Sequence, residues 1–135
     1  MALTKSEKID MVQLAMKRVN VVPYEENAIQ FGTNMKTVEI SEDAVTVCET
    51  YINVTQENRT CHIGFSVVLS QAVTSEFYLE VDGNERAKKY RNTNATIQFM
   101  DFFLLGVGLH QITVKAKAES RASISPREAR LGVYL

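Results

Sequence analysis

His62 and His110 are the only histidines in this 135-residue chain and its ordinary candidates for a general base or a metal ligand. Metal ligands and catalytic bases usually share one element with a second functional group at a fixed spacing. His62 falls on the polar side of an alternating segment, and His110 follows a glycine-rich turn. No ligand spacing joins them, so we expect two structural histidines and no metal site.

Cys48 and Cys61 are the only two cysteines. A structural zinc site would need further Cys or His partners, and neither cysteine lies in a recognisable catalytic motif. The sequence favours two buried free thiols. A bridge between neighbouring strands stays open as an alternative, if the protein works outside a cell.

Other signatures of catalysis are missing from the sequence. It contains neither a G-x-S-x-G nor a Walker A motif, and nothing selects a pair among its 16 acidic residues. We therefore predict that the protein is not an enzyme, with no catalytic residues and no cofactor.

The charge balance argues against a nucleic-acid partner. The chain has 15 basic and 16 acidic residues, a net charge of −1, and no Trp. A stacking groove for nucleic acid would need basic residues interleaved with exposed aromatic residues. The densest basic cluster, residues 86–91, is read either as a solvated hairpin or as an anion-binding surface.

The first segment carries the only helical pattern. Thr4 and Glu7 fit a capping box, and apolar residues then recur at helical spacing, at Ile9, Val12, Met16 and Val19. We expect an attachment or oligomerisation helix within residues 1–22. Charged residues at the start argue against a signal peptide, and no apolar run is long enough to cross a membrane.

From Pro23 onward the sequence has the pattern of short strands and turns. Apolar residues alternate with polar ones in residues 61–69, and residues 82–84 form a turn signal. Seven or eight strands without intervening helices predict a mainly β protein: an antiparallel β-sandwich or jelly roll, residues 23–135, preceded by one N-terminal α-helix.

Three stretches carry a family resemblance: FYLEVDG at 77–83, LGVGLHQITV at 105–114 and ARLGVYL at 129–135. Their order resembles the jelly-roll head domains of phage tails, fibres and baseplates, which are similar to tumour-necrosis-factor-like trimers. The resemblance covers less than half of the chain.

The same resemblance implies a non-enzymatic virion protein assembled in the host cytoplasm. Such a protein is a tail or baseplate appendage that forms a homotrimer, contacts other virion proteins and presents loops to a host-surface saccharide or protein. The alternative is a capsid-decoration protein that stabilises the particle without binding a receptor. A signalling or carbohydrate-binding module outside viruses is a third interpretation.

Residues 100–109 are more apolar than one alternating strand needs for its own core. They form either part of a subunit interface or a central buried strand. We select Phe102 and Leu104 from this segment, with Arg130 and Tyr134 on the last strand, as candidates for the oligomer interface.

Overall fold

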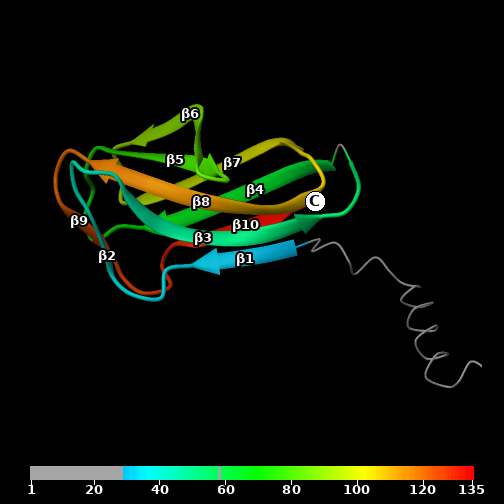
Figure 1. The fold of residues 1–135 in the computed structure, drawn as a ribbon. Helices are drawn as coiled ribbons and strands as arrows, with labels where there is room; N and C mark the ends of the chain where they lie inside the picture. The colour runs from blue at the N-terminus through cyan, green and yellow to red at the C-terminus, as the bar shows by residue number, and fades with distance from the viewer. Residues whose placement is uncertain (1–28, 58) are drawn as a thin grey trace, which may run out of the picture.

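A computed structural model describes residues 29–57 and 59–135, and this part of the chain is built from β-strands and their connections (Figure 1). The strands are β1 (Ile29–Thr33), β2 (Val38–Ile40), β3 (Val45–Val54), β4 (Arg59–Val68), β5 (Ser75–Val81), β6 (Asn84–Asn92), β7 (Thr96–Leu105), β8 (Gly108–Ala118), β9 (Ala122–Ile124) and β10 (Arg130–Tyr134).

Two four-stranded antiparallel sheets lie face to face. The first sheet has the order β1-β10-β4-β7 and the second has the order β3-β8-β5-β6, while β2 pairs with β9 at one end (Figure 1). Strands that are neighbours in the sheets are therefore mostly distant in sequence. This strand order, which crosses repeatedly between the two sheets, defines a jelly-roll sandwich.

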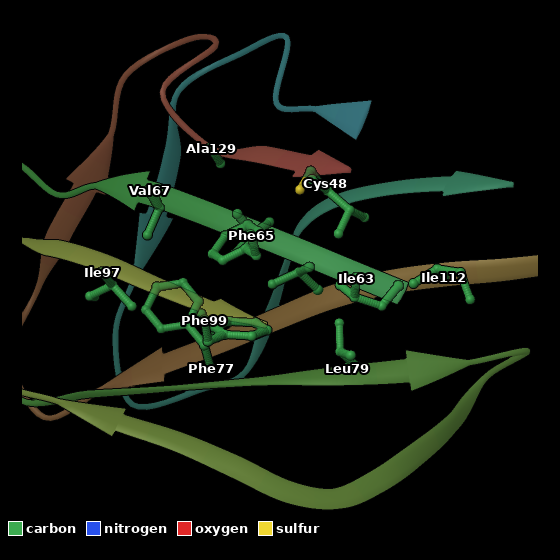
Figure 2. Close-up of a cluster of buried hydrophobic side chains, with 14 of the residues drawn as sticks. Cys48, Ile63, Phe65, Val67, Phe77, Leu79, Ile97, Phe99, Ile112 and Ala129 are labelled. Carbon is green, nitrogen blue, oxygen red and sulfur yellow. The ribbon is translucent and has the colours of Figure 1, made fainter. Parts of the chain in front are cut away.

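Aromatic and aliphatic side chains fill the space between the two sheets (Figure 2). Phe65 on β4 packs against Phe77 on β5 and Phe99 on β7, with ring centroids 5.7 and 5.1 Å apart. Tyr90 on β6 stacks on Phe99 at 3.9 Å and closes the β6–β7 edge of the core. Because side chains alternate across a strand, these contacts also fix which residues face outward.

The expected fold class needs a correction. The described residues are all-β and contain no helix, so a mainly β fold with an N-terminal helix is wrong for this part of the chain. Its backbone pairs into antiparallel ladders from Ile29 onward, in keeping with the period-two pattern. The helix expected within residues 1–22 and the domain boundary after it lie outside the described residues.

The antiparallel jelly-roll sandwich itself is confirmed, and several strands fall where the alternation predicts them. The sequence analysis did not find β1, a five-residue strand at the edge of the first sheet. The turn expected at residues 82–84 joins β5 to β6, and its central residues Asp82 and Gly83 have φ angles of 54° and 84°.

A buried asparagine fastens the loop before β10 to the chain after β1. Asn34 is 4% exposed, and its side-chain amide donates to the carbonyl oxygens of Lys36 and Ser125. Its side-chain oxygen accepts a hydrogen bond from the backbone N–H of Ala129. Asn34 thereby satisfies backbone groups that no strand ladder pairs.

Replacing Asn34 with Ala is expected to lower the free energy of unfolding by about 2–3 kcal/mol, because buried partners of its amide lose their hydrogen bonds. Urea unfolding measures the change. Asn94→Ala, at an exposed turn position, is the matched control and should change stability by less than about 0.5 kcal/mol. Equal effects of the two variants would contradict the role assigned to Asn34.

Candidate functional site

The outer face of the first sheet is arranged in rows that cross all four strands. One row contains Ile29, Tyr134, His62 and Phe102. The next row contains Phe31, Gly132, Gly64 and Met100. A third row contains Thr33, Arg130, Ser66 and Gln98. The face thus changes from apolar at the end near the C-terminus to polar at the end near β2 and β9.

Four large apolar side chains at the end of this face near the C-terminus form what we call the apolar patch. They are Ile29, Phe102, Leu104 and Tyr134, with exposed fractions of 57%, 67%, 68% and 42%. His62 lies among them, stacked on the Tyr134 ring at 5.2 Å and 6.2 Å from the Phe102 ring. The patch is therefore continuous across the sheet.

The outer face of the second sheet has a different composition. Tyr78 on β5 is paired with Lys115 on β8 and Lys89 on β6, and the Lys89 ammonium lies 4.0 Å from the centre of the Tyr78 ring. Gln111 donates hydrogen bonds to Glu49 and to the hydroxyl of Tyr51. Charged and polar groups thus cover this face, as expected of a surface in contact with water.

A groove of about 870 Å³ lies beside the apolar patch on the first sheet. Gly64 and Gly132, which are opposite one another on β4 and β10, form its floor. Phe31 and Met100 flank this floor, and Arg130 lines the polar end. Its volume is within the range of ordinary ligand-binding sites.

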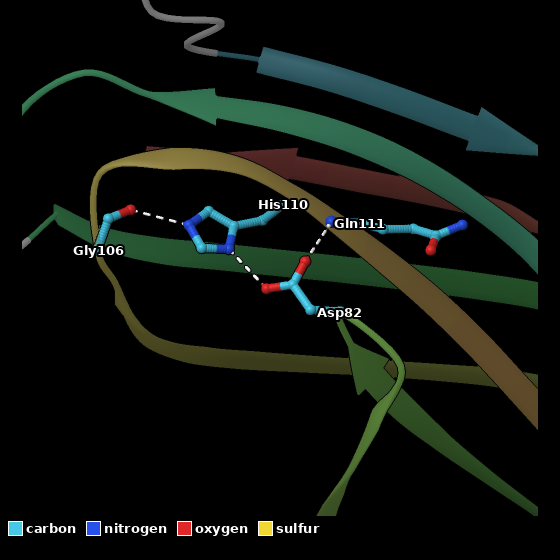
Figure 3. A network of polar contacts seen from close by, with 4 residues as sticks. All are labelled: Asp82, Gly106, His110 and Gln111. Atoms are coloured by element: carbon cyan, nitrogen blue, oxygen red, sulfur yellow. Dashed lines mark hydrogen bonds and ion pairs between the residues drawn. The ribbon is translucent and has the colours of Figure 1, made fainter.

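His110 fastens two turns at one end of the sandwich (Figure 3). Its Nδ1 lies 2.7 Å from a carboxylate oxygen of Asp82, and its Nε2 lies 2.8 Å from the carbonyl oxygen of Gly106. The other carboxylate oxygen of Asp82 accepts a hydrogen bond from the backbone N–H of Gln111. Because both ring nitrogens face acceptors, only the protonated imidazolium satisfies both contacts.

This geometry shifts the pKa of both side chains. Burial lowers the pKa of His110, but the hydrogen bonds to Asp82 and Gly106 outweigh burial, so the pKa is raised above its ordinary value. Burial raises the pKa of Asp82, but its hydrogen bonds with His110 and Gln111 outweigh that effect and lower the pKa. The arrangement holds charge in place and has the character of a structural clamp.

The thiols are placed for packing. Cys48 and Cys61 are free and buried, and burial raises their pKa to about 12 and about 11. A thiol with a raised pKa is a poor nucleophile near neutral pH. Among residues 29–57 and 59–135, no group of three or more His, Cys, Asp or Glu side chains could hold a metal ion.

The basic cluster expected either as a hairpin or as an anion site lies on β6. Arg86 is paired with Asp101, Lys89 with Glu85 and Arg91 with Glu119. Three basic side chains of the cluster are therefore already paired with carboxylates of this chain, which favours the hairpin interpretation.

The structure places all four predicted interface residues on the outer face of the first sheet. Phe102, Leu104 and Tyr134 belong to the apolar patch, while Arg130 lies two rows away in the groove. Their role in an interface stays a prediction. β7 is an edge strand, so residues 100–105 do not form a central buried strand.

The sequence analysis missed the other half of this face. Ile29 and Phe31 lie two residues apart on β1, and this alternation was the only sequence signal that both side chains face the same side of a strand. The opposition of Gly64 and Gly132 depends on the pairing of β4 with β10, which no local pattern reveals. In the part of the chain that the structure describes, no helix is long and apolar enough to cross a membrane.

These features define a jelly-roll sandwich with one apolar, grooved face. No family model and no curated protein matches the chain. Among solved structures, a family 35 carbohydrate-binding module from Clostridium thermocellum is similar at 11% identity, with a TM-score of 0.50 over 78% of this chain and 97% of that one. At this identity the similarity shows the fold alone.

Two further structures are similar at lower scores. The sugar-binding EclA C-terminal domain is 10% identical, with a TM-score of 0.49 over 73% of this chain and 79% of that one. The Eiger TNF structure from S. frugiperda is 12% identical, with a TM-score of 0.45 over 79% of this chain and 90% of that one.

Replacing His110 with Gln is expected to reduce stability in a pH-dependent way. Because the folded-state pKa of His110 is raised, its contribution is complete below the unfolded-state pKa and is lost as pH rises through the folded-state pKa. Asp82 has a lowered pKa, so its contribution is lost only as pH falls through that value in the acid range.

In urea unfolding, the free energies of unfolding of wild type and His110→Gln should therefore differ by about 1 kcal/mol near pH 5.5. This difference should become smaller at each step toward about pH 8.5. A difference that stays constant over this range would contradict an imidazolium clamp.

Proposed function

We propose that the protein is a non-enzymatic phage virion protein, a tail or baseplate appendage that associates with itself through the apolar patch and binds a host-surface receptor. The resemblance of its three sequence stretches to phage head domains supports the virion role and a trimer. The observation that carries self-association is the apolar patch itself, because its side chains stay exposed to water unless another surface covers them.

The size of the patch supports a protein contact. A large side chain exposes on the order of 200 Å² when free, so at their exposed fractions the four residues provide about 450 Å² of apolar surface. A standard interface buries roughly 800 Å² on each partner. The patch thus supplies more than half of that area.

The charge pattern supports a second copy of the chain as the occupant of the patch. No carboxylate, lysine or arginine interrupts the row that runs from Ile29 through Tyr134 to Phe102, and its polar groups are the His62 imidazole and the Tyr134 hydroxyl. Copies of this row therefore meet without like-charge repulsion, as a symmetric assembly requires. The charged outer face of the second sheet does not offer this property.

Light scattering on the purified protein tests self-association. We expect a mass near three times 15.2 kDa for wild type and a folded monomer for Leu104→Asp, because the charge cannot be desolvated in the contact. Tyr51→Asp, at a similarly exposed position on the second sheet, is the matched control and should stay assembled. Phe102→Ser provides a second, uncharged test of the patch.

A monomeric wild type, or a Leu104→Asp protein that keeps the full mass, would overturn the role of the patch. Unfolding of Leu104→Asp but not of Phe102→Ser would indicate that Leu104 belongs to the core of the protomer.

Immunogold labelling of purified particles tests the virion role separately. We expect label at the tail end of the particle. Particles without label, prepared from a culture that produces the protein, would contradict it.

A further inference from the structure

Among residues 29–57 and 59–135, no contact accounts for the paired glycines of the groove. A Cβ at Gly32 would collide with the backbone of Glu49, and Gly83 has a positive φ angle, so these two positions require glycine. A Cβ at Gly64 would meet no atom within 4 Å, and one at Gly132 would make only ordinary contacts with Phe31 and with the carbonyl oxygen of Gly64.

Glycine inside a strand is destabilising relative to Ala, because glycine loses more backbone freedom on folding. Where no internal contact requires it, a glycine leaves space above the sheet, and strand glycines often mark a place where a ligand or another backbone approaches closely. Here that space is the part of the groove between Phe31 and Met100.

The polar end of the groove carries two arginines that are free for a ligand. Arg127 and Arg130 line the groove, and neither has a carboxylate within ion-pair distance among the residues that the structure describes. Thr33, Ser66 and Gln98 add hydroxyl and amide groups beside them. This contrasts with β6, where carboxylates of the chain already pair Arg86, Lys89 and Arg91.

The backbone holds these arginines in a fixed place. Arg127 has a φ angle of 69°, an uncommon conformation for a residue other than glycine. It is kept there by a hydrogen bond from its N–H to the carbonyl oxygen of Asn34, while its own carbonyl oxygen accepts a hydrogen bond from Arg130 Nε. These two hydrogen bonds keep the turn that carries Arg127 beside the start of β10, where Arg130 lies.

We propose that the groove binds a negatively charged cell-surface saccharide. The apolar face of a sugar ring lies above the Gly64–Gly132 floor against Phe31, and its carboxylate or phosphate group pairs with Arg130 and Arg127. Gln98 and Ser66 bind its hydroxyl groups. The site would serve the receptor binding of the proposed function and rests on that function.

Charge and polarity favour this occupant over a second copy of the chain. A subunit contact would leave two arginines and three uncharged polar side chains in an apolar interface, where unpaired charge is costly. A saccharide acid pairs with the guanidinium groups and leaves the apolar patch beside the groove free for assembly. The groove then lies at the edge of the subunit contact.

NMR titration of the full chain tests the site, because the backbone amide signals of Gly64 and Gly132 report on the groove floor. The probes are trigalacturonate and glucose 1-phosphate, with trigalacturonate methyl ester and glucose as their neutral counterparts. We expect at least one acidic probe to shift both glycine signals and to bind at least 10-fold more tightly than its neutral counterpart.

Two variants should abolish that binding. Arg130→Gln removes the charge, and Gly64→Val fills the groove at a position where a Cβ has no other atom within 4 Å. Arg121→Gln is the matched control, because it removes an exposed arginine that does not line the groove. It should change affinity less than 2-fold.

Equal affinity for acidic and neutral probes, or loss of binding in Arg121→Gln as in Arg130→Gln, would overturn the charge recognition. Unshifted glycine signals with both acidic probes would overturn the site. Light scattering on the same samples tests self-association independently of saccharide binding. An assembled protein that binds no probe contradicts only the proposed binding site in the groove. Saccharide binding by a monomeric wild type contradicts the assembly alone.

Discussion

Phe65, Phe77 and Phe99 pack together between the two sheets, and the position of every outward-facing residue depends on this contact. A shift of one residue in a ladder that contains Phe65, Phe77 or Phe99 would turn an aromatic ring to solvent, and in the other ladders it would turn buried aliphatic side chains outward, so the core determines a single register. That register aligns Phe31, Gly132, Gly64 and Met100 across four strands. The core packing on the inner side of the sheet thus determines which residues line the groove on its outer side.

The two outer faces show what the core does not determine. Both sheets have a buried side and an exposed side, but one exposed side carries paired charges and the other carries the apolar patch. Neither the strands nor the core require this difference, since polar side chains at Phe102 or Leu104 would leave the inward contacts intact. An exposed apolar surface of this kind marks a contact site. Asn34 and the clamp of Asp82 with His110 add to this frame by fixing the loops at its two ends.

Much of the sandwich could be predicted from the sequence because alternation is a local signal. Residues 61–69 show which side chains of β4 are buried, and the strand at Val45–Val54 falls where its β-branched residues indicate. β1 was missed because its five residues include only two large apolar side chains, Ile29 and Phe31.

The face itself was predictable only in part. The pattern puts Phe102 and Leu104 on one side of a strand, but whether that side is covered depends on the neighbouring layer. The pairing of Gly64 with Gly132 and the approach of Arg127 to Arg130 need the topology. The helix expected within residues 1–22 falls outside the described residues.

The central claim is that a second copy of the chain covers the apolar patch, and hydroxyl-radical footprinting tests it most directly. Tyr134 in the patch and Tyr51 on the second sheet are a matched pair, with exposed fractions of 42% and 48% in the protomer. We predict that Tyr134 is oxidised several-fold more slowly than Tyr51 in the wild-type protein, and at a similar rate in Leu104→Asp. Equal oxidation of the two tyrosines in the wild-type protein would contradict the account.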